Sequence, residues 1–297
     1  MKKNLLGGLI LLAAAIIWGF AFVAQSEGMD KIGPLTFQAS RMLLASLVLL
    51  PTALIFDKIR ENKGGAKQKF IDKKTLVSGA ICGIFLFVAS ALQQAGIAYT
   101  SVGHAGFLTA LYILIVPVLG IFMGKKVLGR IWLCIALALS GLYLLCMTGE
   151  GFSMSIGDVL VTLSAFVFSL HIIAIDKFAA SLDGVKISFV QTTVAGLISL
   201  VCAFIFEEPV IADIAASWLP IAYAGIFSCG IAYTFQIIGQ KYAEPAVASI
   251  IMSLESVFAV LGGALLLFQI PSLYELCGCS LMFAATIISQ LPSKKAK

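Results

Sequence analysis

The sequence predicts an all-α polytopic membrane protein, with ten transmembrane helices arranged as two inverted five-helix repeats. The first indication is composition: 60% of the residues are hydrophobic and 12% are charged, whereas a soluble domain has about 25% charged residues. The second is that apolar stretches of about 20 residues, long enough to cross a hydrocarbon core of ~30 Å, follow one another along the chain. The third is the uneven distribution of charge among the connectors.

The ten predicted spans share this length and apolar character. They are expected near residues 4–24, 35–56, 75–97, 101–123, 129–147, 156–175, 185–206, 215–238, 245–268 and 272–291. The first span could instead be a cleaved secretory signal, because Lys2 and Lys3 precede it. Its apolar run is, however, longer than a usual signal core. The one sizeable polar segment, Asp57–Lys74, is interpreted as a solvated connector.

Basic residues mark one side of the membrane. Of the 20 Lys and Arg residues, 18 precede the first span or lie in the connectors after spans 2, 4, 6, 8 and 10. The opposite connectors contain only Lys31, and Arg41 lies inside span 2. The positive-inside rule then places both termini in the cytoplasm, in a multi-pass protein of the plasma (inner) membrane. Because the net charge of +5 follows this topology, it does not indicate a nucleic-acid partner.

The cysteines and glycines offer no sign of a cofactor or an ATP site. All seven cysteines lie within predicted spans, so a disulfide framework in an oxidising compartment is not expected. Cys277 and Cys279 have neither metal-ligand spacing nor a partner histidine. The segment Gly120–Lys125 lacks the spacing and hydroxyl residue of a phosphate-binding loop. We therefore expect no bound cofactor and no metal.

Comparison of the chain with itself indicates an internal repeat. A shift of 143 residues superposes Gln93 on Gln236, Gly96 on Gly239, Tyr99 on Tyr242 and Ala105 on Ala248. Farther along, a shift of 139 fits better, which predicts four extra residues at the start of span 4 in the first half. The predicted repeats are residues 1–150 and 151–297, with five spans each. Since five is odd, the second repeat would be inverted relative to the first, as in many secondary transporters.

Several motifs at these junctions resemble a known family. They are Trp18-Gly19-Phe20, Arg41, Leu92–Ser101, Ala105–Thr109 and Leu254–Ala259. Together they resemble EamA-type members of the drug/metabolite transporter superfamily over the full length of the chain. The resemblance implies transport of small metabolites, amino acids or drugs, commonly as efflux, driven by ion or substrate gradients without ATP hydrolysis.

Three positions differ from the pattern of that family. The family's Leu-Glu-Pro reads Leu254-Glu255-Ser256 here, the acid that often ends this helix is replaced by Gln269, and the matching position in the first half is Lys125. The fold that the resemblance implies does not depend on these positions.

Charged residues inside spans are the first candidates for transport, because insertion scales give about 2.5–3.5 kcal/mol for the most unfavourable ones at a helix centre. Glu255 is expected near the middle of span 9, as a proton carrier or counter-ion to a cationic substrate, or as a hydrogen-bonded bridge between helices. Arg41 in span 2 presents a planar fork suited to carboxylates. It would contact an anionic or zwitterionic substrate, or hold helices together by binding backbone carbonyls.

Uncharged polar and aromatic residues form a second set of candidates. They would line a cavity for neutral or zwitterionic solutes, or join helices through hydrogen bonds. These are Trp18, Gln93, Gln94, Thr109, Tyr112, Tyr233, Gln236 and Ser253. Gln38, His104 and His171 are weaker candidates, since an isolated polar residue in a span more often binds a neighbouring helix.

These features favour a secondary active transporter that works by alternating access, with its substrate site near the bilayer midplane. The expected partners are a small-molecule substrate, the lipid bilayer and a coupled proton, in a monomer or homodimer. A passive facilitator or channel is a second interpretation, although it would predict a more continuous polar stripe. An intramembrane enzyme is a third, but Glu255 has no acidic partner in the spans, so no enzymatic activity is expected.

Overall fold

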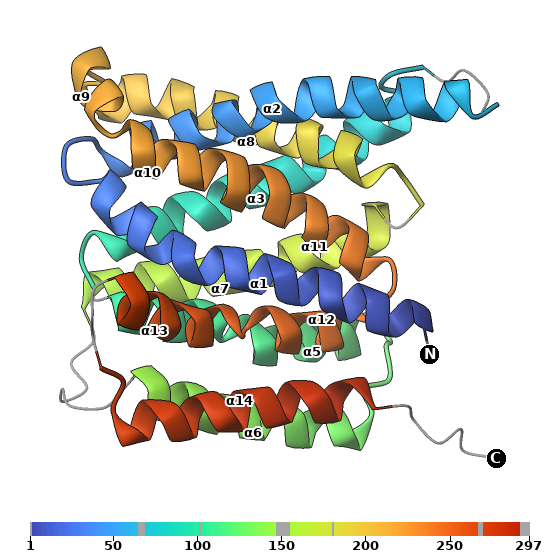
Figure 1. Cartoon of the computed structure of the whole chain (residues 1–297), viewed down its shortest axis with the longest axis vertical. Helices are drawn as coiled ribbons and strands as arrows, with labels where there is room; N and C mark the ends of the chain where they lie inside the picture. The colour runs from blue at the N-terminus through green and yellow to red at the C-terminus, as the bar shows by residue number, and fades with distance from the viewer. Residues whose placement is uncertain are drawn as a thin grey trace.

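The computed structural model describes residues 2–64, 69–100, 102–146, 155–179, 181–266 and 270–291. Within these ranges the chain folds into long helices that cross the molecule side by side (Figure 1). Nine of the described helices are long and apolar enough to span a membrane, and Gly129–Leu145 is a shorter apolar helix. The predicted all-α polytopic fold is therefore confirmed.

The first half of the chain consists of α-helices. They are α1 (Lys2–Gly28), α2 (Pro34–Asn62), α3 (Lys73–Ile97), α4 (Val102–Ala110), α5 (Tyr112–Phe122) and α6 (Gly129–Cys146). The second half also contains two π-helical segments, η1 and η2. Its elements are α7 (Ile156–Ala174), η1 (Ile175–Ala179), α8 (Gly184–Phe206), α9 (Ile211–Ala216), α10 (Trp218–Ala222), η2 (Tyr223–Ala232), α11 (Tyr233–Gln240), α12 (Pro245–Met252), α13 (Glu255–Leu266) and α14 (Leu273–Gln290).

Local sequence signals set where several helices begin. Ser155 and Asp158 form a capping box at the start of α7, and Ser272 and Glu275 form another at the start of α14. Asp72 caps α3 by accepting a hydrogen bond from the backbone N–H of Thr75. Such caps satisfy backbone donors that have no partner inside the helix. Hydrogen bonding with Thr75 also lowers the pKa of the Asp72 carboxyl below its usual value.

Two predicted spans are each broken into two helices. The span predicted at 101–123 is divided between α4 and α5, and the span at 245–268 between α12 and α13. Val102 and Pro245 begin these broken spans and lie 143 residues apart, as do Tyr112 and Glu255, which begin their second helices. The offset of 143 thus fits both the start and the break of these two spans, and the predicted change to 139 with four extra residues at the start of span 4 is not found there. Pro117 lies inside α5, beyond the break.

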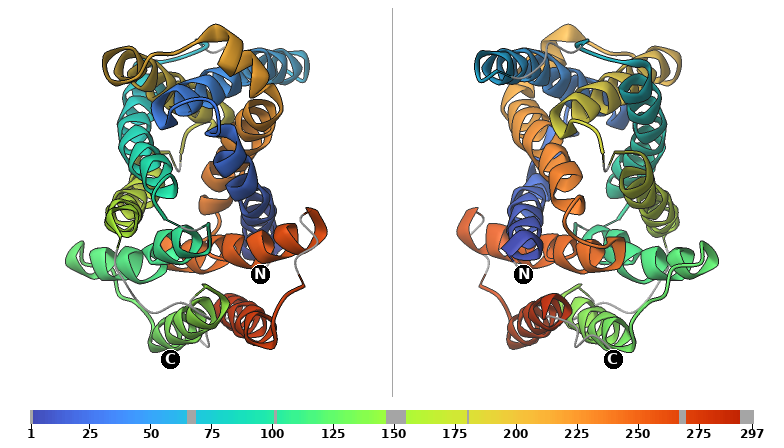
Figure 2. Two further views of the ribbon diagram at one scale, coloured as in Figure 1. Left: turned by 90° about the vertical axis from the view of Figure 1, so that its left-hand side faces the viewer. Right: turned by 90° about the vertical axis from the view of Figure 1, so that its right-hand side faces the viewer.

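Helix packing pairs each half of the chain with the other. Helix α2 packs along α8, α6 along α14, and α3 along α7, while α1 packs along η2 and α11. Viewed along the helices, α2 and α8 lie with the short α9 at one extreme of the molecule and α6 and α14 at the other, and the remaining helices lie between them (Figures 1 and 2). The centre of the molecule is therefore bounded by helices from both halves.

Glycines allow two of these pairs to approach closely at related positions. A Cβ atom on Gly96 would lie 2.9 Å from the carbonyl oxygen of Gly157, where α3 crosses α7. A Cβ atom on Gly239 would lie 3.2 Å from the carbonyl oxygen of Gly7, where α11 crosses α1. Because Gly96 and Gly239 coincide in the self-comparison, their shared identity has a packing reason: a side chain at either position would force the neighbouring helix to shift.

The α2–α8 pair is held at both ends. At one end the Glu207 carboxylate accepts hydrogen bonds from the backbone N–H groups of Leu35 and Thr36, both at 2.8 Å. At the other end Lys186 pairs with Asp57 at 2.7 Å. Arg60 also contacts Asp57, which explains why α2 continues nearly two turns beyond its predicted end at 56.

Candidate functional site

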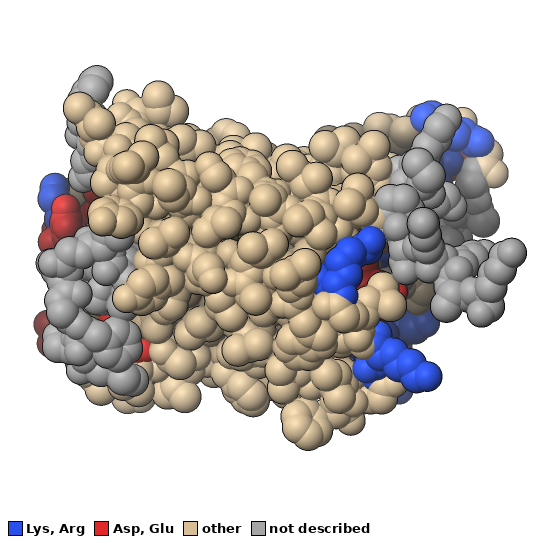
Figure 3. Space-filling view, turned by 90° about the horizontal axis from the view of Figure 1, so that it is seen from below, with Lys and Arg blue, Asp and Glu red and all other residues tan. Residues whose placement is uncertain are grey.

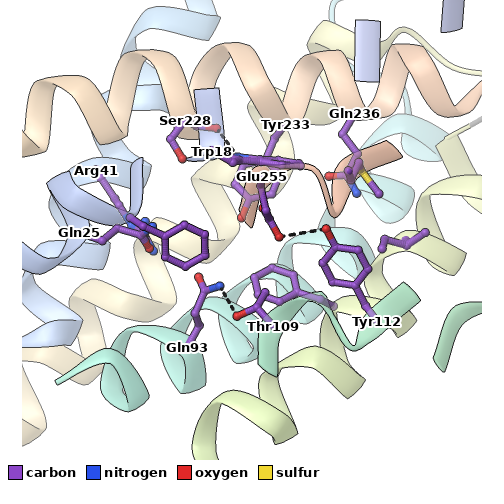
Figure 4. Close-up of a pocket in the computed structure, with 14 residues that line it drawn as sticks. Trp18, Gln25, Arg41, Gln93, Thr109, Tyr112, Ser228, Tyr233, Gln236 and Glu255 are labelled. Carbon is purple, nitrogen blue, oxygen red and sulfur yellow. Dashed lines mark hydrogen bonds between the residues drawn. The ribbon is translucent and has the colours of Figure 1, made fainter. Parts of the chain in front are cut away.

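A cavity lies at the centre of the molecule, among helices of both halves (Figure 4). The space between its walls is about 510 Å³, part of which is open to solvent. Seven lining residues come from each half of the chain. They are Trp18, Phe22, Gln25, Arg41, Gln93, Thr109 and Tyr112, and Phe168, Ile172, Ser228, Tyr233, Gln236, Met252 and Glu255.

Glu255 and Tyr112 join the two broken spans across this cavity. The hydroxyl of Tyr112 donates a hydrogen bond to Oε1 of Glu255 at 3.0 Å, and both side chains are buried. Each residue begins the second helix of its broken span. Glu255, the one acidic residue of the lining, therefore lies at the break of its span and contacts the Tyr112 hydroxyl from the other half of the chain.

Arg41 is the one basic residue of the lining, and its side chain is buried. Its Nη1 donates to Oε1 of Gln25 at 2.8 Å, and its guanidinium lies 5.5 Å from the ring centroid of Phe37. Its Nε has no hydrogen-bond partner. Among the described residues no carboxylate lies within 4.0 Å of the guanidinium, so this buried charge is not neutralised by an ion pair.

Aromatic rings form much of the cavity wall. Trp18 and Tyr233 lie with their ring centroids 5.1 Å apart, and Nε1 of Trp18 donates to the carbonyl oxygen of Ser228 at 3.3 Å. Phe22 and Phe168 add apolar surface. Apolar walls with a few placed polar groups are typical of small-molecule sites.

Two glutamines at equivalent positions of the repeat face the same cavity. Nε2 of Gln93 donates to Oγ1 of Thr109 at 3.1 Å. Gln236, 143 residues later, is buried and its Oε1 has no partner. An unpartnered buried amide oxygen costs free energy, so Gln236 has an unused acceptor beside the cavity.

The structure brings eight of the predicted site residues together in this lining. They are Trp18, Arg41, Gln93, Thr109, Tyr112, Tyr233, Gln236 and Glu255.

Four other candidates lie outside the lining and bind neighbouring groups. Gln38 donates to the carbonyl oxygen of Phe87, and Gln94 to that of Gln25. The hydroxyl of Ser253, the residue that follows α12, donates to the carbonyl oxygen of Ile250 in that helix. Nε2 of His171 lies 3.1 Å from Oε1 of Gln191, and the His171 and Tyr233 rings meet edge to face with centroids 6.0 Å apart. The side chain of His104 lies outside the described residues.

Six lining residues were not predicted from the sequence. They are Phe22, Gln25, Phe168, Ile172, Ser228 and Met252. A sequence signal did exist for two of them, because Phe22 and Gln25 follow Trp18 at i+4 and i+7 and thus share its helix face. The others are common apolar or small residues, which nothing local distinguishes from lipid-facing or packing positions.

No set of metal ligands is found in the described part of the chain, where no group of three or more His, Cys, Asp or Glu side chains comes together. The lining combines one acid, one base, amides, hydroxyls and aromatic rings. Such a set can bind a small organic molecule through a few polar contacts within apolar walls.

Comparison with protein-family models decides the family. The model of the EamA-like transporter family matches residues 5–147 and again residues 155–290. This chain belongs to that family. The two matches cover both halves of this EamA-like transporter, so the resemblance seen in the sequence motifs is confirmed. The protein is a multi-pass membrane transporter and not an enzyme.

Individual relatives agree with this assignment. An uncharacterized transporter of Archaeoglobus fulgidus is 28% identical over 291 residues, which cover 97% of this chain and 87% of the relative. A protein of known crystal structure shares the fold with a TM-score of 0.75 and 20% identity, over 95% of this chain and 96% of that one. The fold shared with this crystal structure thus extends over nearly the whole chain.

Proposed function

We propose that this EamA-like transporter moves a small organic solute across the plasma membrane by alternating access, with the central cavity as the solute site. The observation that supports this most directly is that each half of the chain contributes seven residues to one cavity. A relative movement of the two halves would therefore reshape every wall of the site. The cavity lies within a single chain, so a monomer suffices.

The arrangement of helices supports two inverted repeats, 1–150 and 151–297. Helices α1 and α7 begin at opposite ends of the molecule (Figure 1). The crossing of α3 over α7 has a counterpart in the crossing of α11 over α1, each with a close glycine contact. Inverted repeats can exchange two equivalent packings, and this exchange alternates the side on which a midplane site opens.

The orientation in the membrane follows from charge. The start of α1 and the end of α14 lie at the same end of the helix bundle, on the right in Figure 1. Basic side chains gather on that side (Figure 3). By the positive-inside rule this end faces the cytoplasm. Solute export is the direction that the family resemblance favours.

Glu255 is proposed to couple transport to protons. It is the one acidic residue of the lining and is buried, with Tyr112 as its hydrogen-bond partner. A buried carboxyl at membrane depth can exchange its proton when the cavity opens to either side. Proton release and solute release would then take place in the same cavity.

Counterflow in liposomes tests the transport proposal. A thermal-shift screen of metabolites and amino acids on the detergent-solubilised protein first identifies solutes that bind, because a ligand of the folded state raises the melting temperature. Purified protein is then reconstituted with the best binder inside the vesicles. We expect saturable accumulation of the labelled solute from outside. Flux that rises linearly with concentration would instead indicate a passive facilitator or channel.

A further inference from the structure

We propose that Arg41 binds a carboxylate of the transported solute, so that the substrates of this protein are organic monocarboxylates. This inference rests on the proposed function of the central cavity as the solute site and adds the chemical class of the solute. It follows from the buried guanidinium of Arg41, which has no ion-pair partner among the described residues.

The contrast between the two most buried basic residues in the described part of the chain supports this inference. Lys186 and Arg41 are 4% and 3% exposed, respectively. Lys186 has a carboxylate, Asp57, at 2.7 Å. Arg41 has only the neutral amide of Gln25 and the ring of Phe37. Because an uncompensated buried charge is strongly destabilising, an anion from outside the chain would be bound favourably at Arg41.

The hydrogen bonds of Arg41 leave one edge of its guanidinium available. Nη1 is engaged with Oε1 of Gln25, and the backbone carbonyl of Gln25 is itself bound by Nε2 of Gln94. These bonds orient the planar group at the cavity wall. Nε is buried without a hydrogen-bond partner, and no described residue binds Nη2. The Nε–Nη2 edge matches the two oxygens of a carboxylate, which arginine binds in bidentate fashion.

The rest of the lining favours a single negative charge on an apolar body. Arg41 is the one cation and Glu255 the one acid among the lining residues, so a dianion such as a phosphate monoester would be only half neutralised. The remaining walls are largely aromatic, with Trp18, Phe22 and Tyr233 among them. Glu255 does not serve as the missing anion here: its carboxyl accepts from Tyr112, and the ion pairs within 4.0 Å among the described residues include none between Glu255 and Arg41.

Paired probes test the carboxylate requirement on the full chain in detergent. The pairs are phenylacetate and phenylacetamide, butyrate and butyramide, and phenylalanine and phenylalaninamide, each differing in the carboxylate alone. We expect at least one acid to raise the melting temperature and its amide to bind about tenfold or more weakly. If no acid binds, or if amides bind as well as acids, the proposal is wrong.

A carboxylate introduced into the protein beside Arg41 gives the most discriminating variant. In Gln25→Glu the new carboxylate would stand 2.8 Å from Nη1 of Arg41 in place of the amide oxygen and should neutralise the guanidinium. Both this variant and Gln25→Met lose the 3.3 Å hydrogen bond from Nε2 of Gln25 to the carbonyl oxygen of Ala21, so the loss of that bond does not distinguish them. We expect the acid probes to lose binding by about tenfold or more. The matched variant Gln25→Met removes the same hydrogen bond without adding charge and should lose less. Equal losses in both variants, or undiminished acid binding in Gln25→Glu, would overturn the assignment.

The outcome separates this inference from the transport proposal. Saturable counterflow of a neutral solute that is unaffected by Gln25→Glu would refute the carboxylate site and leave transport standing. Acid binding that is lost in Gln25→Glu, together with an absence of counterflow for every bound acid, would support the site and refute transport through it.

Discussion

Tyr112 and Glu255 lie 143 residues apart in the chain and meet in a hydrogen bond of 3.0 Å. The same offset superposes Gln93 on Gln236 and Gly96 on Gly239. The bond therefore joins equivalent positions of the two halves, at the point where each half breaks a membrane span into two helices. Tyr112 and Glu255 are thus equivalent in the repeat, lie at the two helix breaks and line the cavity.

Removal of the phenol hydroxyl should weaken the fold. In Tyr112→Phe the buried Glu255 carboxyl loses its hydrogen-bond donor, which we expect to cost about 1–3 kcal/mol of unfolding free energy. The melting temperature of the solubilised protein measures this loss. Tyr143→Phe is the control, because Tyr143 is exposed on α6 and should leave the melting temperature unchanged. Equal melting temperatures for wild type and Tyr112→Phe would show that the hydrogen bond does not stabilise the fold.

Replacement of the central acid should uncouple transport from protons. Glu255→Gln retains an oxygen that can accept from Tyr112, so expression and folding should persist. An amide cannot exchange a proton, and uptake driven by an imposed pH gradient should be abolished. Solute uptake in liposomes with and without the gradient measures the effect, with the exposed Glu61→Gln as control. An unchanged pH dependence would exclude Glu255 from proton coupling.

The ion pair between α2 and α8 should respond asymmetrically to mutation. Asp57→Asn leaves Lys186 buried without an anion, and loss of a partner from a buried pair costs about 3–5 kcal/mol. Lys186→Met leaves Asp57 with Arg60 as a partner, so its loss should be smaller. Unfolding of the two variants in detergent compares them. A larger loss for Lys186→Met would contradict the pairing seen in the structure.

The crossing of α6 and α14 should not accept a side chain at its closest point. A Cβ atom on Gly141 would lie 2.7 Å from the carbonyl oxygen of Gly278, whereas a Cβ atom on Gly129 has nothing within 4 Å. We expect Gly141→Ala to destabilise the protein by about 1–3 kcal/mol through overpacking. Gly129→Ala, on the same helix, should be tolerated. Thermal unfolding of both variants checks the prediction, and it fails if the two alanine variants melt together.

Labelling of intact cells tests the proposed orientation. A cysteine introduced at Asp30 should react with an impermeant maleimide added outside, because the connector after α1 is on the side with few basic residues. A cysteine at Lys63 should react only after the cells are permeabilised. The reverse pattern would place the termini outside.

Much of the fold could be predicted because its signals are local. The lengths of the apolar stretches, the distribution of lysines and the caps at Asp72, Ser155 and Ser272 depend on neighbouring residues alone. The breaks within the spans at 101–123 and 245–268 were not predicted, since neither sequence has a local breaker at that point and both breaks occur where the two halves meet.

The sequence alone determined that this protein lies within a membrane, how many times the chain can cross it, and which polar residues merit attention. The tertiary structure alone decided which of them share a cavity. Gln93 and Gln94 are adjacent, yet Gln93 lines the cavity and Gln94 binds the backbone of Gln25. Successive helix residues point about 100° apart, and in a bilayer both lipid-facing and buried positions are apolar. Only packing between helices reveals which face turns toward the solute.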